Sequence, residues 1–283
     1  MAGNPKIQVG ALNIAASPHP VGVYRRLLEL AANVEIHLHG SDWGKITAVT
    51  PLEDRPELLT GRVVLWAHID KDGKWLNKKK NIEATPIEKQ SIVLPPDFEP
   101  NFRSFYFVFN EPTHRLVVEL RNELGQTFGP SRAEKFFAKL FNHSALAEVE
   151  VEVAVTVIPT EDALDRIFDI PRLRWLRIHN TRPNAEDLSD EAEILHARLK
   201  AMGAKSQDLE LAKAAKVTTI KPDGEIRALA DAAAVDGHVE GRGKTEAGAN
   251  VYESTKLHPK VVEIEVQGGS SFTAFLSSLL SLL

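Results

Sequence analysis

The sequence predicts an α+β protein, because strand periodicity and helix periodicity both occur throughout the chain. Residues 34–39 alternate between apolar and polar side chains, as half-buried strands do. In the second half, strands over 149–158 and 173–179 flank a short helix at 164–168, an order typical of a split, ferredoxin-like β-α-β unit. We therefore expect mixed sheets, with this unit in the second half and an amphipathic helix at the C-terminus.

The first half alternates between strands and helices. A strand over 7–15 precedes a helix over 24–32, and later apolar runs predict strands over 61–69, 102–109 and 115–120. The Asp-Gly pair that ends Asp70-Lys71-Asp72-Gly73 predicts a hairpin turn into 74–76. A Pro-rich connector over 94–100 fits neither a helix nor a central strand, and a helix follows from residue 129.

The second half continues with helices over 188–202 and 226–234. Residues 237–244 and 250–255 then predict strands joined by a glycine-rich turn, and a last strand covers 261–266. Short polar residues near 142–148 suggest a boundary between two closely packed α+β domains, residues 1–145 and residues 146–283 with the terminal docking helix.

Composition excludes several classes of chemistry. The 283 residues include no cysteine, which rules out disulfides, thiolate-bound zinc and a thiol nucleophile. The N-terminus lacks an export signal, and no apolar stretch reaches the ~20 residues that a membrane span requires. We expect a cytoplasmic protein that does not engage a membrane. The net charge of −5 gives no global attraction to nucleic acid but permits a local basic surface.

Catalytic signatures are weak. No nucleophile elbow, zinc-protease motif, calcium loop or dinucleotide fingerprint occurs, and Gly243-Lys244-Thr245 lacks the strand-to-helix context of a phosphate loop. His37 and His39 lie two apart, as zinc ligands on a strand can, but alternating polar residues on an open strand explain them equally well. We expect no cofactor and no metal, and the sequence favours a non-enzymatic role while leaving an enzyme open.

Two segments combine tryptophan with basic residues. Lysines neutralise phosphates and aromatic rings stack on bases, so this combination is typical of surfaces that follow a nucleic-acid backbone. The candidate contacts are Lys74, Trp75, Lys78, Lys79 and Lys80 in the first segment, and Arg172, Arg174 and Arg177 in the second. Solvated hairpin or strand faces remain the alternative interpretation of both segments.

The C-terminal segment has apolar residues at the spacing of an amphipathic helix and only serine and threonine on its polar face. Because that face carries no positive charge, docking onto the domain or onto a second copy is favoured over an anionic membrane. The expected oligomer interface consists of Phe272, Phe275, Leu276, Leu279, Leu280 and Leu283.

Short pieces of sequence resemble known families. The chain resembles a family of uncharacterised bacterial proteins that are encoded on mobile elements, often near phage-defence genes. The resemblance lies, in order, in residues 9–14, 61–64, 75–77, 107–109 with 114–116, and 129–131. The segment 241–248 is similar to the C-terminal part of the phage lambda Rex exclusion sensor. The second resemblance implies an antiviral sensor or effector that binds duplex DNA without strong sequence preference.

These observations predict a nucleic-acid-binding, homo-oligomeric component of antiviral defence, with DNA favoured over RNA. No base reading is expected from contacts to phosphate. A metal-dependent nuclease or toxin is one alternative. A scaffold or antitoxin-like partner that contacts only protein, such as another defence protein, is the other.

Overall fold

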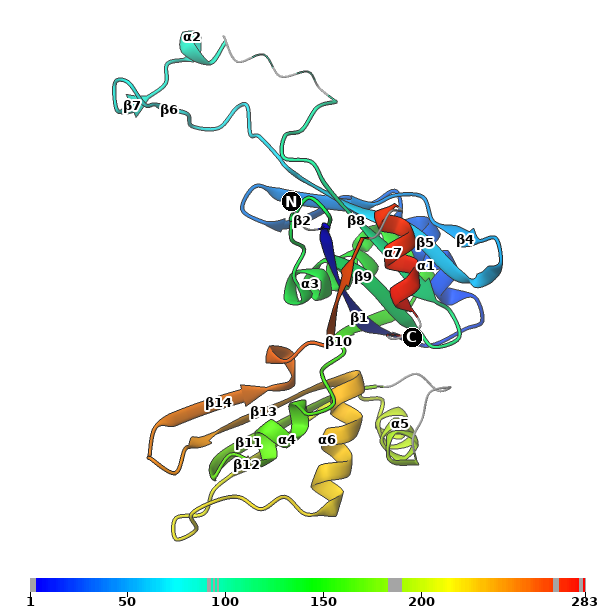
Figure 1. The fold of residues 1–283 in the computed structure, drawn as a ribbon, viewed down its shortest axis with the longest axis vertical. Helices are drawn as coiled ribbons and strands as arrows, with labels where there is room; N and C mark the ends of the chain where they lie inside the picture. Colours follow the sequence, from blue (N-terminus) through cyan, green and yellow to red (C-terminus); the bar gives the residue numbers. More distant parts are fainter. Residues whose placement is uncertain are drawn as a thin grey trace.

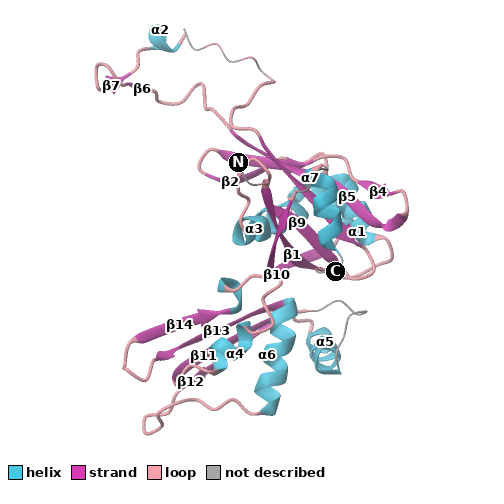
Figure 2. Ribbon diagram, in the orientation of Figure 1, coloured by secondary structure: helices cyan, strands magenta, loops and turns pink. Residues whose placement is uncertain are grey.

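The computed structural model describes residues 4–90, 93, 95, 97–182, 190–266, 270–279 and 282. Helices and strands are both abundant, which confirms the α+β class. Two sheets lie one above the other along the long axis of the molecule, and an extended arm projects from the end opposite the small sheet (Figure 1, Figure 2). All named strand pairs are antiparallel.

The large sheet has the strand order β10-β1-β9-β8-β5-β3-β2, with β15 also paired to β1 and β4 also paired to β5. Its strands are β1 (Lys6–Ser17), β2 (Ile36–His39), β3 (Asp42–Ile46), β4 (Thr50–Leu52), β5 (Arg55–Ala67), β8 (Arg103–Asn110), β9 (Arg115–Arg121), β10 (Glu152–Val157) and β15 (Val261–Glu265).

Helices cover both faces of the large sheet. On one face, α1 (Val23–Ala31) and α3 (Pro130–Phe141) bury apolar side chains in the main core, and the 3-10 helix η1 (Ser144–Val149) lies beside α1. The spacing of Ala133, Phe136, Phe137, Leu140 and Phe141 directs one apolar side of α3 inward. On the other face, α7 (Ser271–Ser278) packs on β1 and β15.

The small sheet has the order β12-β11-β13-β14. Its strands are β11 (Arg172–Thr181), β12 (Ser206–Ala212), β13 (Gly237–Lys244) and β14 (Asn250–Ser254). One face is covered by α4 (Ala163–Phe168) and α6 (Gly224–Asp236), while α5 (Asp190–Met202) packs against α6 (Figure 1). The 3-10 helix η2 (Thr255–Leu257) follows β14.

The predicted β-α-β unit is present as β10, α4 and β11 along the chain, but not as one folding unit. Strand β10 pairs with β1 in the large sheet, whereas β11 is central in the small sheet. Strand β15 also returns to β1 near the end of the chain. The boundary expected between residues 145 and 146 therefore does not coincide with the division between the sheets.

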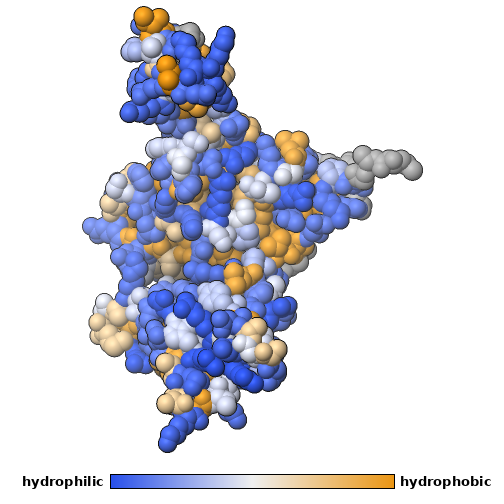
Figure 3. Space-filling model, turned by 90° about the vertical axis from the view of Figure 1, so that its left-hand side faces the viewer, coloured by the Kyte–Doolittle hydropathy of each residue, from blue (hydrophilic) through white to orange (hydrophobic). Residues whose placement is uncertain are grey.

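The arm contains the hairpin of β6 (Leu76–Asn77) and β7 (Ile82–Glu83) and the short helix α2 (Pro86–Lys89). Asp70 accepts backbone hydrogen bonds from Asp72 and Gly73, so a turn forms where the sequence predicted one. It does not return the chain along β5, because β6 pairs with β7. The arm stands apart from the main body, and its surface is largely hydrophilic (Figure 3).

Candidate nucleic-acid interface

Strand β11 divides its side chains between the core and an uncovered face of the small sheet. Leu173, Leu176 and Ile178 are buried under α4 and α6. A register shift between Leu173 and Trp175 places Arg174 at an irregularity, after which Trp175 again points away from the helices. The side of the small sheet opposite α4 and α6, with Trp175 at its centre, is called the open face below.

A row of aromatic and cationic side chains crosses the open face. Trp175, Arg242 and Tyr252 are directly opposed on β11, β13 and β14, and opposed residues of antiparallel strands point to the same side. The Arg242 guanidinium carbon lies 4.4 Å from the Trp175 ring centroid and 5.6 Å from that of Tyr252. Arg242 therefore lies between two rings that it attracts through cation–π interactions.

Further cations surround this row at the free end of the sheet. Arg172 is opposed to Lys244 on β13, and its guanidinium donates to the backbone oxygen of Glu246 at 3.3 Å. Arg174 is exposed and Lys244 is half-buried. Within the described ranges, neither Arg174 nor Lys244 has a carboxylate within ion-pair distance. We call Arg172, Arg174, Trp175, Arg242, Lys244 and Tyr252 the cationic-aromatic patch.

The other end of the open face is compensated internally. Arg177 pairs with Asp208 at 2.8 Å, and His179 Nδ1 lies 3.1 Å from the same carboxylate. The pKa of Arg177 is raised, first through its hydrogen bond to Asp208 and then through the charge of that group. Arg177 is thus closely compensated and lies outside the patch. Arg172 has only a long, exposed ion pair with Glu246 at 3.9 Å, which solvent screens.

His238 belongs to this compensated end. Its ring lies 4.9 Å from that of His179, and burial, followed by the nearby charge of Lys256, lowers its pKa to about 4. His238 is therefore uncharged at neutral pH and adds nothing to the positive potential. The Trp175 indole N–H donates to Glu210 at 2.6 Å, which fixes the ring and occupies that carboxylate.

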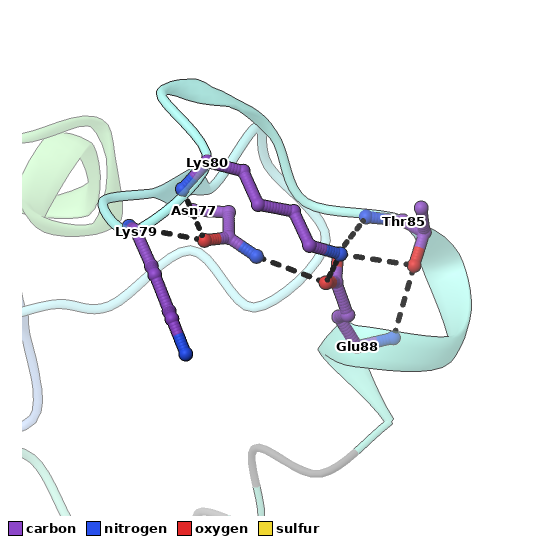
Figure 4. Close-up of polar contacts among 5 residues, drawn as sticks. All are labelled: Asn77, Lys79, Lys80, Thr85 and Glu88. Atoms are coloured by element: carbon purple, nitrogen blue, oxygen red, sulfur yellow. Dashed lines mark hydrogen bonds and ion pairs between the residues drawn. The ribbon is translucent and has the colours of Figure 1, made fainter.

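The predicted lysines of the arm have mostly local roles. Lys80 donates to Glu88 at 2.9 Å, and Glu88 also closes a capping box with Thr85 at the start of α2 (Figure 4). The side chain of Asn77 accepts from the backbone N–H groups of Lys79 and Lys80 and so shapes the hairpin turn.

Two further arm residues are also engaged. The Trp75 indole N–H donates to the backbone oxygen of Asp70 at 3.1 Å, and Lys74 lies 3.7 Å from Glu83. The side chains of Lys78 and Lys79 are the arm's predicted contacts without an ion pair, as far as the chain is described. The arm and the small sheet lie at opposite ends of the long axis, so the two predicted segments do not form one surface (Figure 1).

The C-terminal helix has an intrachain role. Phe275 and Leu279 are buried against the large sheet of their own chain, and Phe272 and Leu276 pack around them. Phe272 stacks near Tyr106 with 4.9 Å between ring centroids. The prediction of an oligomer interface is therefore corrected for Phe275 and Leu279, because both are covered within the chain. Phe272 and Leu276 are half-buried, and their place in an interface stays a prediction. Leu280 and Leu283 lie outside the described residues.

His37 and His39 were the residues considered for a metal site, and their surroundings can be described. His37 Nε2 lies 2.8 Å from the backbone oxygen of Gly40, and His39 lies next to the turn that leads into β3. Among the described residues, no group of three or more histidine and carboxylate side chains could hold a metal ion. No described helix combines the length and hydrophobicity that crossing a bilayer requires.

Sequence reasoning missed three members of the patch: Arg242, Lys244 and Tyr252. Arg242 and Lys244 lie in the predicted strand over 237–244, and Tyr252 lies in the predicted strand over 250–255. Alternation along that strand puts Arg242 and Lys244 on the same side. The sequence does not show which residues lie opposite Arg242 and Lys244, because β13 pairs with β11, a strand far away in the chain.

Together, the fold and the patch define an α+β protein with a covered large sheet and a small sheet that exposes aromatic and cationic side chains. The chain belongs to the family described as a domain of unknown function, DUF4747, whose match covers residues 5–278. A search of curated proteins finds no match to this chain.

Proposed function

We propose that this protein binds nucleic acid through the cationic-aromatic patch of the small sheet. The observation that carries the proposal is the row of Tyr252, Arg242 and Trp175 across three adjacent strands. Aromatic rings on an antiparallel sheet stack on unpaired bases, and guanidinium groups contact phosphates and stack as well. The cations beside the row provide the electrostatic attraction that such binding requires.

The geometry favours single-stranded nucleic acid over the duplex DNA expected from the sequence. In a duplex the faces of the bases are covered by their neighbours, so rings on a sheet have no base face to stack on. Tyr252 remains 44% exposed and lies at the edge strand of the sheet, where a splayed base can reach it. Duplex DNA is therefore tested alongside single strands.

Acidic residues on the same face do not oppose this proposal. Asp208 is held by Arg177 and His179, and Glu210 accepts from Trp175. Both belong to β12, at the far edge from Tyr252. A phosphate backbone that crosses β13 and β14 at Arg242 and Lys244 therefore avoids the carboxylates of β12. Glu240, two residues before Arg242 on β13, is half-buried and lies 3.6 Å from His238, toward the compensated end of the open face.

Binding is tested with charge-matched double variants. We expect Arg242→Gln with Lys244→Gln to weaken binding to a fluorescent single strand about tenfold or more and to lower the slope of log affinity against log salt by about 1–2. Lys78→Gln with Lys79→Gln removes the same charge from the arm, and we expect an effect below about twofold. Fluorescence anisotropy across a salt series measures both.

Two results would count against the proposal. One is the absence of binding to single-stranded DNA, single-stranded RNA and duplex DNA at low salt, where phosphate contacts are strongest. The other is an equal loss in the two double variants, since charge alone would then explain the affinity. A gel after incubation with Mg²⁺ tests the nuclease alternative, and cleavage would replace the binding role with an enzymatic one.

The proposal that binding serves antiviral defence rests on the resemblance found in the sequence. It predicts that phages form fewer plaques on cells that express the protein. Cells that express the Arg242→Gln, Lys244→Gln double variant should lose this protection. Protection that persists in a variant unable to bind nucleic acid would separate the two roles and contradict the proposal.

A further inference from the structure

A second site lies at the other end of the molecule, beside the base of the arm. A cavity of about 580 Å³ is bounded by β3, β5 and the segment that follows the arm. This volume is within the range of small-molecule sites. Trp43 and Trp66 are directly opposed on β3 and β5, so both indoles stand on the same side of the large sheet. Phe102 adds a third ring to the lining.

Carboxylates predominate among the charged groups of this cavity. Glu35, Asp97 and Glu99 line it, against the single ammonium group of Lys45. Glu99 lies 2.7 Å from Nδ1 of His68. Asp97 has no hydrogen-bond or ion-pair partner among the residues that the structure describes. The lining thus combines aromatic faces with uncompensated negative charge.

Lys45 shows what kind of group this lining accepts. Its ammonium nitrogen lies 5.8 Å from the Trp66 ring centroid and 3.2 Å from a carboxylate oxygen of Glu35. An indole face attracts a cation through its quadrupole, and a carboxylate adds direct attraction. The protein's own lysine therefore occupies one position of a combined aromatic and acidic site, while Trp43, Asp97 and Glu99 line the rest of the cavity.

We propose that this cavity binds the alkylammonium group of a ligand, held by the indoles of Trp43 and Trp66 and by the carboxylates of Asp97 and Glu99. The shared chemistry is a compact organic cation, supplied either by a small quaternary amine or by a methylated lysine side chain. A nucleic-acid strand is disfavoured here because three carboxylates would face its phosphates. This site is independent of the cationic-aromatic patch.

Binding is measured by titrating the full-length protein with choline and following the indole N–H signals of Trp43 and Trp66 by NMR. Free Nε-trimethyllysine provides the second source of the cation. The uncharged isostere of choline, 3,3-dimethyl-1-butanol, is the matched control, because it has the same shape without the charge. We expect choline and trimethyllysine to shift both indole signals and the alcohol to shift them at least about fivefold less at equal concentration.

Two variants should change the affinity for choline in opposite directions. Lys45→Gln removes a competing cation, so we expect choline affinity to rise about threefold or more. Asp97→Asn with Glu99→Gln removes counter-charges at exposed positions, and we expect affinity to fall about fivefold or more. An unfolded variant would lose affinity, so a gain with Lys45→Gln cannot result from misfolding.

Each opposite result overturns the proposal. Equal shifts with choline and the alcohol would mean that the cavity is only an apolar surface. No shift up to about 0.1 M choline would mean that it holds no cation. Weaker choline binding in the Lys45→Gln variant would mean that Lys45 does not compete with the bound cation, which contradicts the proposed site. Affinity for a nucleic-acid strand remains unchanged by Lys45→Gln if the two sites are independent.

Discussion

Glu119 on β9 is a carboxylate in an apolar setting. It is 1% exposed, and on the same side of the sheet Tyr106 contacts Phe272 and Phe275 of α7. The backbone N–H of Tyr106 donates to one carboxylate oxygen at 3.1 Å, while the other oxygen has no partner among the described atoms. Burial raises the pKa of Glu119 from 4.5 to about 7, so it takes up a proton near neutrality.

Glu119→Gln is expected to remove a pH dependence of stability. Because the folded pKa lies above the unfolded one, the protonated group supports folding fully below pH 4.5, and this support is lost as pH rises to about 7. Between those values the wild-type unfolding free energy should fall by about 3 kcal/mol more than that of the variant. Urea unfolding across the pH range measures it.

Glu53→Gln is the matched control for this prediction, since Glu53 is exposed in the turn between β4 and β5. It should leave the pH profile of wild type unchanged. An identical profile in the Glu119→Gln variant would mean that Glu119 is ionised without penalty in the folded chain.

At the scale of the element, the pairing of β11 with β13 depends on the absence of a side chain at two positions of β13, Gly237 and Gly243. A Cβ added at Gly237 would overlap the backbone oxygen of His179 on the neighbouring strand. The strands would have to separate where β13 begins. A glycine is needed here for close approach.

Gly237→Ala should therefore destabilise the protein by about 2–4 kcal/mol, because backbone atoms cannot move aside as a flexible side chain can. Gly224→Ala, at the start of α6, meets nothing within 4 Å and is expected to be neutral or slightly stabilising. Thermal unfolding compares the two. Equal stability of both variants would show that the β11–β13 register adapts.

Helix α7 gives a second prediction at this scale. Phe275 is fully buried against the large sheet, so Phe275→Ala should cost about 3–5 kcal/mol of stability without changing the mass of the particle in solution. Ser277→Ala, on the exposed side of α7, should cost less than about 1 kcal/mol. Light scattering that shows dissociation of an oligomer by Phe275→Ala would restore the interface predicted from sequence.

Sequence patterns located most of these elements. The amphipathic spacing of the C-terminal segment identified α7, and alternation identified β11, β13 and β14. Two kinds of result lay beyond such patterns. The stripe of α7 is equally complementary to its own sheet and to another copy. The carboxylates beside Arg177 and Trp175 lie on β12 (Ser206–Ala212), a strand that is not among the predicted elements.

At the scale of the whole molecule, a buried polar contact links the two sheets. The side-chain amide of Asn13 on β1 donates to Asp236 at 2.7 Å, at the end of α6. The hydroxyl of Thr181 on β11 donates to the backbone oxygen of Asp236. These bonds join the large sheet to the small sheet. They lie at the end of β11 that is opposite to the cationic-aromatic patch.

We expect Asn13→Ala and Asp236→Ala to be strongly coupled. A double-mutant cycle should give an interaction free energy of about 1–3 kcal/mol, because each single variant removes a buried hydrogen bond from the other side chain. The exposed pair of Lys6 and Glu263, at 2.7 Å, is the control and should give below about 1 kcal/mol. Additive effects at Asn13 and Asp236 would mean that their side-chain contact does not contribute to holding the sheets together.

By itself, the sequence determined the α+β class, most strands and helices, the exclusion of thiol chemistry and the basic-aromatic character of β11. These properties follow from local periodicity and composition. The tertiary structure decided which strands share a sheet, that α7 covers its own chain, that Arg177 is neutralised by Asp208, and that Arg242 joins Trp175. Such outcomes depend on contacts between residues far apart in the chain, which no local pattern encodes.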